Sequence, residues 1–276
     1  MIKKNKSKTK TNVSILGLFL AFAIMMYVSA MLGLLLLTIL IIWNVYTSRY
    51  AFDAIKGNKA YSRKDYTSAI YYYSRAISCK TVPSSIIRGY VIIQLKYGNP
   101  KEALDTLSSI LSERQFSDSD LVTLRVSKAL ILWKIGNSND AFDILHELLE
   151  SEPDIYIYET LSSLLLIHNR IDEALILLDQ ASDFDNNSNI IKSNLAEANF
   201  KTNNYKISEE IFEELINTNI QFIEPYYFYS KILISKGEIE KALLLLEKAL
   251  NTNDSLLTTV TKDDVQELLN SVNVVN

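Results

Sequence analysis

The stretch YTSAIYYYSRAI, residues 66–77, alternates bulky and small side chains at intervals of three and four residues. The alternating residues are Tyr66, Ala69, Tyr73 and Ala76. Residues spaced in this way lie on one face of an α-helix. The spacing therefore predicts an amphipathic helix over residues 66–77, with both small and large side chains on its packed face.

The small residue of this helix returns along the chain at a near-constant period. Successive copies are separated by 34, 38, 33, 34 and 34 residues and stand at Ala69, Ala103, Ala141, Ala174, Ser208 and Ala242. A large residue follows four positions later, at Tyr73, Leu107, Leu145, Leu178, Phe212 and Leu246. An isolated helix would explain residues 66–77 alone, but six returns predict a repeat architecture.

Residues that accept a left-handed backbone conformation stand shortly before the small residue in five copies. They are Gly98, Gly136, Asn169, Asn203 and Gly237. Such residues commonly end helices, so each is expected to close the first helix of its copy. The single interval of 38 leaves four extra residues around RQFSDSD, residues 114–120, which we expect to lengthen a loop.

This pattern resembles the tetratricopeptide repeat, whose copies fold as two antiparallel helices. A small residue within the first helix also fits, at Gly57, Ala129, Ser162, Ala196 and Ser230, whereas the second copy departs with Val91. The resemblance implies an all-α superhelical solenoid of about six helix-turn-helix repeats over residues 47–254. Residues 255–276 are expected to supply a capping helix and tail, because TKDDVQELLNSV (261–272) carries an apolar stripe.

A long apolar segment precedes the repeats. Residues 13–46, VSILGLFLAFAIMMYVSAMLGLLLLTILIIWNVY, contain no formally charged side chain over thirty-four positions. About 20 apolar residues cross a bilayer, so we expect this segment to be transmembrane and to bind membrane lipid. A cleaved signal peptide with VSA (28–30) at its cut site is the weaker reading, since the apolar run continues well beyond that point.

The charges on the two sides of this segment bear on its topology. Residues 1–12 form a basic tail with five lysines, and five more cations follow, at Arg49, Lys56, Lys59, Arg63 and Lys64. Basic flanks favour the cytoplasm, so a short hairpin with both ends inside is the preferred prediction. A single crossing that exports the body is the alternative, because each half of a hairpin would span only about 16–17 residues.

Motifs for chemistry are missing from this sequence. It has no phosphate-binding glycine loop, nucleophile elbow or dinucleotide fingerprint, and its histidines, His146 and His168, fall in different copies. The net charge of −4 includes the five N-terminal lysines, so the rest of the chain carries −9. We therefore predict no enzyme activity, cofactor, metal, nucleic acid or small-molecule substrate.

The resemblance implies that first-helix residues line a concave groove for a protein or peptide partner. Matched position by position, the second and third copies give Arg88, Ile92, Lys96, Val126, Leu130, Trp133 and Lys134. The later copies give Tyr156, Glu159, Ile167, Phe200, Lys201, Tyr227 and Lys231. Aromatic side chains beside spaced cations suit a peptide with apolar and acidic side chains.

Together these features predict a membrane-anchored, non-catalytic scaffold. The abundance of isoleucine, asparagine and lysine is typical of AT-rich bacterial genomes, so the expected setting is a bacterial plasma membrane with the repeats in the cytoplasm. Three alternatives stay open: an exported accessory protein for envelope assembly or secretion, a regulatory subunit of a separate membrane enzyme, and a solenoid that only self-associates.

Overall fold

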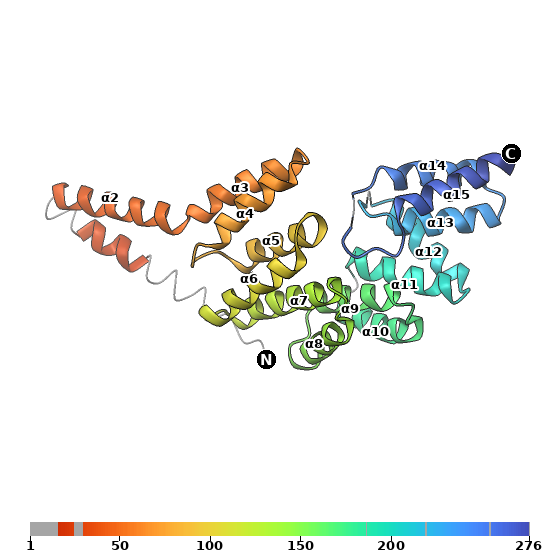
Figure 1. Ribbon diagram of the computed structural model, residues 1–276, viewed down its shortest axis with the longest axis horizontal. Helices are drawn as coiled ribbons and strands as arrows, with labels where there is room; N and C mark the ends of the chain where they lie inside the picture. Colours follow the sequence, from red (N-terminus) through yellow and green to blue (C-terminus); the bar gives the residue numbers. More distant parts are fainter. Residues whose placement is uncertain (1–15, 25–29, 186, 219, 254, 276) are drawn as a thin grey trace. The chain divides into compact units, whose positions relative to one another are not determined.

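The computed structural model describes residues 16–24, 30–185, 187–218, 220–253 and 255–275, and their regular secondary structure is entirely helical (Figure 1). The predicted basic tail, residues 1–12, lies outside the described residues, as do residues 13–15 and 25–29 of the predicted transmembrane segment. The chain forms two compact units, Met1–Gly136 and Asn137–Asn276, which are described separately.

The described residues of unit 1 form a helical stretch at residues 16–24 and six bounded helices. These are α2 (Ala30–Thr47), α3 (Arg49–Ser62), α4 (Tyr66–Ile77), α5 (Ser84–Tyr97), α6 (Pro100–Glu113) and α7 (Asp118–Lys134). Helix α3 packs on α4, α5 packs on both α4 and α6, and α7 packs on α5 and α6. Unit 1 therefore contains two helix pairs, α3–α4 and α5–α6, and the helix α7.

Within its described residues, unit 2 forms eight helices. They are α8 (Ser138–Ser151), α9 (Ile155–Ile167), α10 (Ile171–Phe184), α11 (Asn189–Lys201), α12 (Tyr205–Ile216), α13 (Glu224–Ser235), α14 (Ile239–Leu250) and α15 (Lys262–Val275). The pairs are α9–α10, α11–α12 and α13–α14, and the first helices α9, α11 and α13 also pack on one another in that order. Helix α15 packs against α14, so it covers the C-terminal end of this stack.

The predicted small residues lie at the centres of the helix contacts. All six, from Ala69 to Ala242, have no exposed surface. In the last five copies the large residue four positions later is also buried, from Leu107 to Leu246. These two residues lie one turn apart on the same face, so the small one admits a neighbouring helix while the large one fills the space beside it.

The helix ends follow the predicted left-handed residues with one exception. Gly136, Asn169, Asn203 and Gly237 all have positive φ angles. Gly98 does not: its φ is −128°, so the prediction for this residue was wrong. A Cβ at Gly98 would lie 2.0 Å from Gln94 Oε1, so this glycine instead makes room for a buried side chain.

The four extra residues of the third copy lengthen a helix, contrary to the predicted longer loop. Ala129 is the twelfth residue of α7, whereas Ser162 is only the eighth residue of α9. The Ser117 hydroxyl accepts a hydrogen bond from the Asp120 backbone N–H at 3.2 Å, and acidic residues fill the first turn. Capping and the helix dipole together stabilise an added turn.

The apolar N-terminal region has a distinct form. Across the described residues, no single helix has both the length and the apolarity needed to cross a membrane. Two consecutive helices, Leu32–Thr47 and Arg49–Ser62, together have the required length and apolarity. The chain bends by 43° between them. Helix α2 exposes large apolar side chains, among them Leu34, Ile42 and Trp43, which are 53%, 68% and 66% exposed.

The first copy carries Tyr73 where the others carry leucine or phenylalanine, and two glycines flank its ring. A Cβ at Gly57 in α3 would lie 2.7 Å from Tyr73 Cδ2, and one at Gly89 in α5 would lie 2.9 Å from Tyr73 Cε1. The Tyr73 hydroxyl donates a hydrogen bond to Asn58 Oδ1 at 2.6 Å. The ring thus lies close to a glycine on each of two helices.

We predict that Gly57→Ala destabilises unit 1 by about 1–2 kcal/mol, measured by denaturant unfolding of the full chain in detergent. Alanine favours a helix by roughly 0.5–1 kcal/mol over glycine, but the clash with the Tyr73 ring outweighs this gain. In a Tyr73→Leu background the clash is absent, so the same substitution should become neutral or stabilising. Equal effects in both backgrounds would contradict the proposed role of the ring.

Candidate functional site: the first-helix face of unit 2

The predicted groove residues of unit 1 divide into surface and core positions. On α5, Arg88 is exposed, and Ile92 and Lys96 are half-buried. On α7, Val126 and Leu130 are 0% and 2% exposed, so both side chains belong to the core. The last two predicted residues in this unit, Trp133 and Lys134, lie together at the end of α7, with Lys134 Nζ 5.7 Å from the centroid of the Trp133 ring.

In unit 2, three predicted residues meet across two helices. Lys231 on α13 places its Nζ 5.6 Å from the ring centroid of Phe200 on α11 and 5.4 Å from that of Tyr227 on α13. Such cation–π contacts hold the ammonium group near both rings. Tyr156 is half-buried on α9. The structure thus unites Phe200, Tyr227 and Lys231 into an aromatic and cationic cluster.

Two buried glutamates lie on the same first helices and were missed by the sequence analysis. Glu197 on α11 is 1% exposed, and Glu224 at the start of α13 is 7% exposed. Lys201, a predicted groove residue one turn after Glu197, forms an ion pair with Glu197 Oε1 at 2.8 Å. We call the surface of α9, α11 and α13 that carries these glutamates, Lys201 and the aromatic cluster the first-helix face.

A segment between α14 and α15 reaches this face and supplies hydrogen bonds to both glutamates. The Thr259 hydroxyl donates to Glu197 Oε2 at 2.8 Å, and the Thr258 hydroxyl lies 2.5 Å from Glu224 Oε1. Val260, the next residue, is buried in the core of unit 2. We call residues 255–261 the strap, because two of its threonines contact glutamates on α11 and α13 that lie far from the strap in the sequence.

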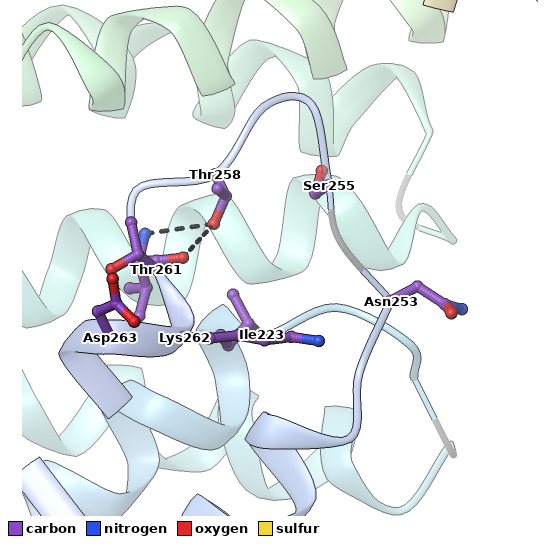
Figure 2. A pocket seen from close by; sticks show the side chains of 8 residues that line it. Ile223, Asn253, Ser255, Thr258, Thr261, Lys262 and Asp263 are labelled. Atoms are coloured by element: carbon purple, nitrogen blue, oxygen red, sulfur yellow. Dashed lines mark hydrogen bonds between the residues drawn. The ribbon is translucent and has the colours of Figure 1, made fainter. Parts of the chain in front are cut away.

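The hydroxyl of Thr258 has more acceptors than protons. It lies 2.7 Å from its other acceptor, the Val260 carbonyl oxygen, and it accepts a hydrogen bond from the Val260 backbone N–H at 3.2 Å (Figure 2). A hydroxyl donates one proton only, so it cannot donate to Val260 and to an ionised Glu224 at the same time. The Thr258 hydroxyl therefore donates to Glu224 Oε1 or to the Val260 carbonyl oxygen, one at a time.

The surroundings raise the pKa of both carboxyl groups, and burial is the main cause. Burial raises the pKa of Glu197, and the Lys201 ammonium and the Thr259 hydroxyl oppose the shift. Burial also raises the pKa of Glu224; its hydrogen bond with Thr258 opposes the shift, and the negative charge of Glu197 adds to it. Both groups therefore take up protons more readily than a glutamate in water.

A pocket of about 260 Å³ lies beside the strap, next to Ile223 and the first turn of α15 (Figure 2). Its other lining residues are Asn253, Ser255, Thr258, Val260, Thr261, Lys262 and Asp263. A cavity therefore remains between the strap and Ile223, the residue before α13. Throughout the described part of the chain, no three His, Cys, Asp or Glu side chains come together as metal ligands would.

Comparisons with known proteins identify the last helix pair. The family model of the tetratricopeptide repeat matches residues 223–255, which include α13 and α14. A search of curated proteins finds no match. Among solved structures, yeast Tom70 aligns with 75% of this chain at a TM-score of 0.56 and 13% identity, and the aligned part is 43% of the Tom70 chain.

Two further solved structures align less closely. A tetratricopeptide repeat protein from Parabacteroides merdae ATCC 43184 covers 81% of this chain and 98% of its own, with 18% identity and a TM-score of 0.46. A crystal structure of MamA covers 57% of this chain and 91% of its own, with 19% identity and a TM-score of 0.43.

These findings support an all-α fold with tetratricopeptide-like helix pairs. The family match identifies one repeat, and the same small and large packing residues recur in the other copies. The Tom70 likeness shows a shared fold and nothing about function. Tetratricopeptide repeats generally form non-catalytic interaction scaffolds, and their stacked surfaces bind other proteins.

We predict that the folded chain gains stability as the pH falls from neutrality towards the ordinary pKa of a glutamate side chain. Glu197 and Glu224 have raised pKa values in the folded state, so folding binds protons in this range, and stability is lost as the pH rises through it. The measurement is the melting temperature across this range, in detergent.

Glu224→Gln should flatten this pH dependence and raise the melting temperature near neutral pH by roughly 2–4 °C, the equivalent of about 1 kcal/mol. Glu210→Gln, at an exposed position on α12, is the matched control and should change neither. If Glu224→Gln and Glu210→Gln give the same pH profile, the buried carboxyl does not control this dependence.

Proposed function

We propose that this chain is a non-catalytic scaffold, anchored in a membrane by its N-terminal apolar segment, that holds protein partners on its helical repeats. The observation that carries the proposal is the direct connection of an exposed apolar helix, α2, to a helical-repeat fold that begins with α3. The fold supports the binding role, and the exposed helix supports the anchor.

The membrane anchor is supported by the surface of α2. Helix α2 has no charged side chain, and side chains along its length are more than half exposed, including Leu34, Ile42 and Trp43. Soluble proteins rarely present so large a contiguous apolar surface to water. Lipid would cover this surface, and each fully buried leucine side chain would contribute about 1.5–3 kcal/mol.

The proposed location is a bacterial plasma membrane with the repeats on the cytoplasmic side. Cations follow α2 closely, at Arg49, Lys56 and Lys59 on α3, and such residues are retained on the cytoplasmic side. The lysines of residues 1–12 add the same preference at the other end of the segment. The exported alternative, with one crossing, differs from this proposal in the side on which the repeats lie.

The proposed ligand is a segment of another protein. The cluster of Phe200, Tyr227 and Lys231 combines two aromatic rings with an ammonium group, which suits an apolar side chain next to an acidic one. Trp133 and Lys134 repeat this combination on α7. No step of this role requires a cofactor or a reaction.

We predict that the full chain stays in the membrane pellet after washing with alkaline carbonate. Leu35→Arg with Ile42→Arg should release most of it, because each arginine costs about 2.5–3.5 kcal/mol near the bilayer centre. Ile176→Arg with Leu244→Arg, at exposed apolar positions on α10 and α14, is the matched control and should stay in the pellet. Release of the unmodified chain would overturn the anchor.

The side of the membrane on which the repeats lie can be tested by adding protease to intact cells from which any outer wall has been removed. Protection of residues 47–276 until lysis is the expected result, and digestion in intact cells would place the repeats outside and favour the exported alternative.

We also predict that Trp133→Ala and Tyr227→Ala each reduce the recovery of specifically co-purifying proteins several-fold, measured by quantitative mass spectrometry after crosslinking. Interface aromatic residues contribute more binding energy than most other contacts. Ile176→Ala, on the exposed surface of α10, is the control. Unchanged recovery with both aromatic variants would contradict partner binding at these positions, and a co-purified enzyme would point to the regulatory-subunit alternative.

A further inference from the structure

We propose that the first-helix face of unit 2 is a binding site for a peptide segment with two adjacent hydroxyl side chains followed by a small apolar residue, and that the strap fills this site within the chain itself. This inference deepens the proposed function and rests on its premise that the first helices bind peptides. The strap sequence Thr258-Thr259-Val260 then defines the class of ligand.

The contacts of the strap are those of a bound peptide. Two neighbouring residues reach two different first helices: Thr258 contacts Glu224 on α13, and Thr259 contacts Glu197 on α11. Val260 follows and is buried with the core residues of unit 2. Three successive side chains thus bind two acceptors and an apolar site on a surface formed by separate repeats.

The two carboxyl groups that the strap contacts are buried and need hydrogen-bond partners. Glu197 and Glu224 are each more than nine-tenths buried, and a buried carboxyl without hydrogen-bond partners costs several kcal/mol. Lys201 pairs with one oxygen of Glu197, which leaves the other oxygen to Thr259. A ligand that replaced the strap would have to supply both hydroxyl contacts again.

A hydroxyl fits these carboxyl groups better than a second cation. Threonine and serine can donate or accept, so they match a carboxyl group in either protonation state, whereas a lysine can only donate. Burial raises the pKa of Glu197 and of Glu224, which favours a partner that can accept. Lys201 already supplies one positive charge at this position.

The first three residues of the strap are less buried than Val260. Ser255 is exposed, and Leu256 and Leu257 are only half-buried. The pocket of about 260 Å³ adjoins it, next to Ile223. A segment held by a few side chains beside a cavity can be displaced at a lower cost than a helix of the core.

The experiment uses a fluorescent synthetic peptide, SLLTTVTK, the sequence of residues 255–262, with the full chain in detergent. The double variant, Thr258→Val with Thr259→Val, keeps the shape of the strap but removes both hydroxyls. We expect this variant to bind the peptide at least tenfold more tightly than the unmodified chain, whose own strap competes. Thr67→Val, at an exposed position on α4, is the matched control and should bind as the unmodified chain does.

Peptide variants test the ligand class by the same anisotropy measurement. SLLVVVTK should bind to the double variant at least tenfold more weakly than SLLTTVTK does. Equal binding of these two peptides would overturn the role of the hydroxyls, and tighter binding of SLLKKVTK would show a site for cations instead. Absence of binding by any peptide, in a variant that is folded and melts cooperatively by circular dichroism, would overturn the inference.

If the double variant does not fold, hydrogen exchange on the unmodified chain tests displacement of the strap instead. Saturating SLLTTVTK should accelerate exchange of the strap amides several-fold, and unchanged exchange would count against displacement. Failure of these peptide tests with retained partner capture at Trp133 and Tyr227 would remove only this inference. Loss of that capture would instead contradict the proposed function.

Discussion

The constraint on which both units depend is the close approach of two helices at a side chain no larger than alanine or serine. Ala174 and Ala242 have no exposed surface, and neither do two small residues of the first helices, Ser162 and Ser230. Packed helix axes lie roughly 8–10 Å apart, and the small residues allow the lower end of that range. The Ser230 hydroxyl is satisfied there, because it donates to the Tyr226 carbonyl oxygen at 2.6 Å.

The first helix pair meets the same constraint with different side chains. Tyr73 is much larger than the leucine found in most copies, and glycine replaces a side chain on each of the two helices that flank it, at Gly57 and Gly89. The larger ring is thus matched by residues without side chains on the two helices beside it. This compensation explains why core positions tolerate different residues when their neighbours change in the opposite sense.

Periodicity made the helix pairs and their core predictable, because each small residue repeats a local contact with a neighbouring helix. It gave no indication that Gly98 accommodates Gln94, or that the added residues of the third copy extend α7, since both depend on one specific side chain or cap. On the first-helix face, the aromatic and cationic cluster occupies positions that the repeat pattern assigns to the groove. Glu197 is buried, and its hydroxyl partner Thr259 lies 62 residues later in the chain, so no local pattern reports this contact.

The energetic cost of this face bears on its role. Two buried carboxyl groups with raised pKa values stabilise a fold less than well-packed apolar residues would, so stability alone does not account for Glu197 and Glu224. Departures from local folding rules of this kind concentrate at functional sites. In this chain the departure lies on the first helices, beside the aromatic and cationic cluster and beneath a segment that can be displaced. The same face thus combines two buried carboxyl groups with the aromatic and cationic cluster, and it is the face on which we propose that the strap is exchanged for a segment of another protein.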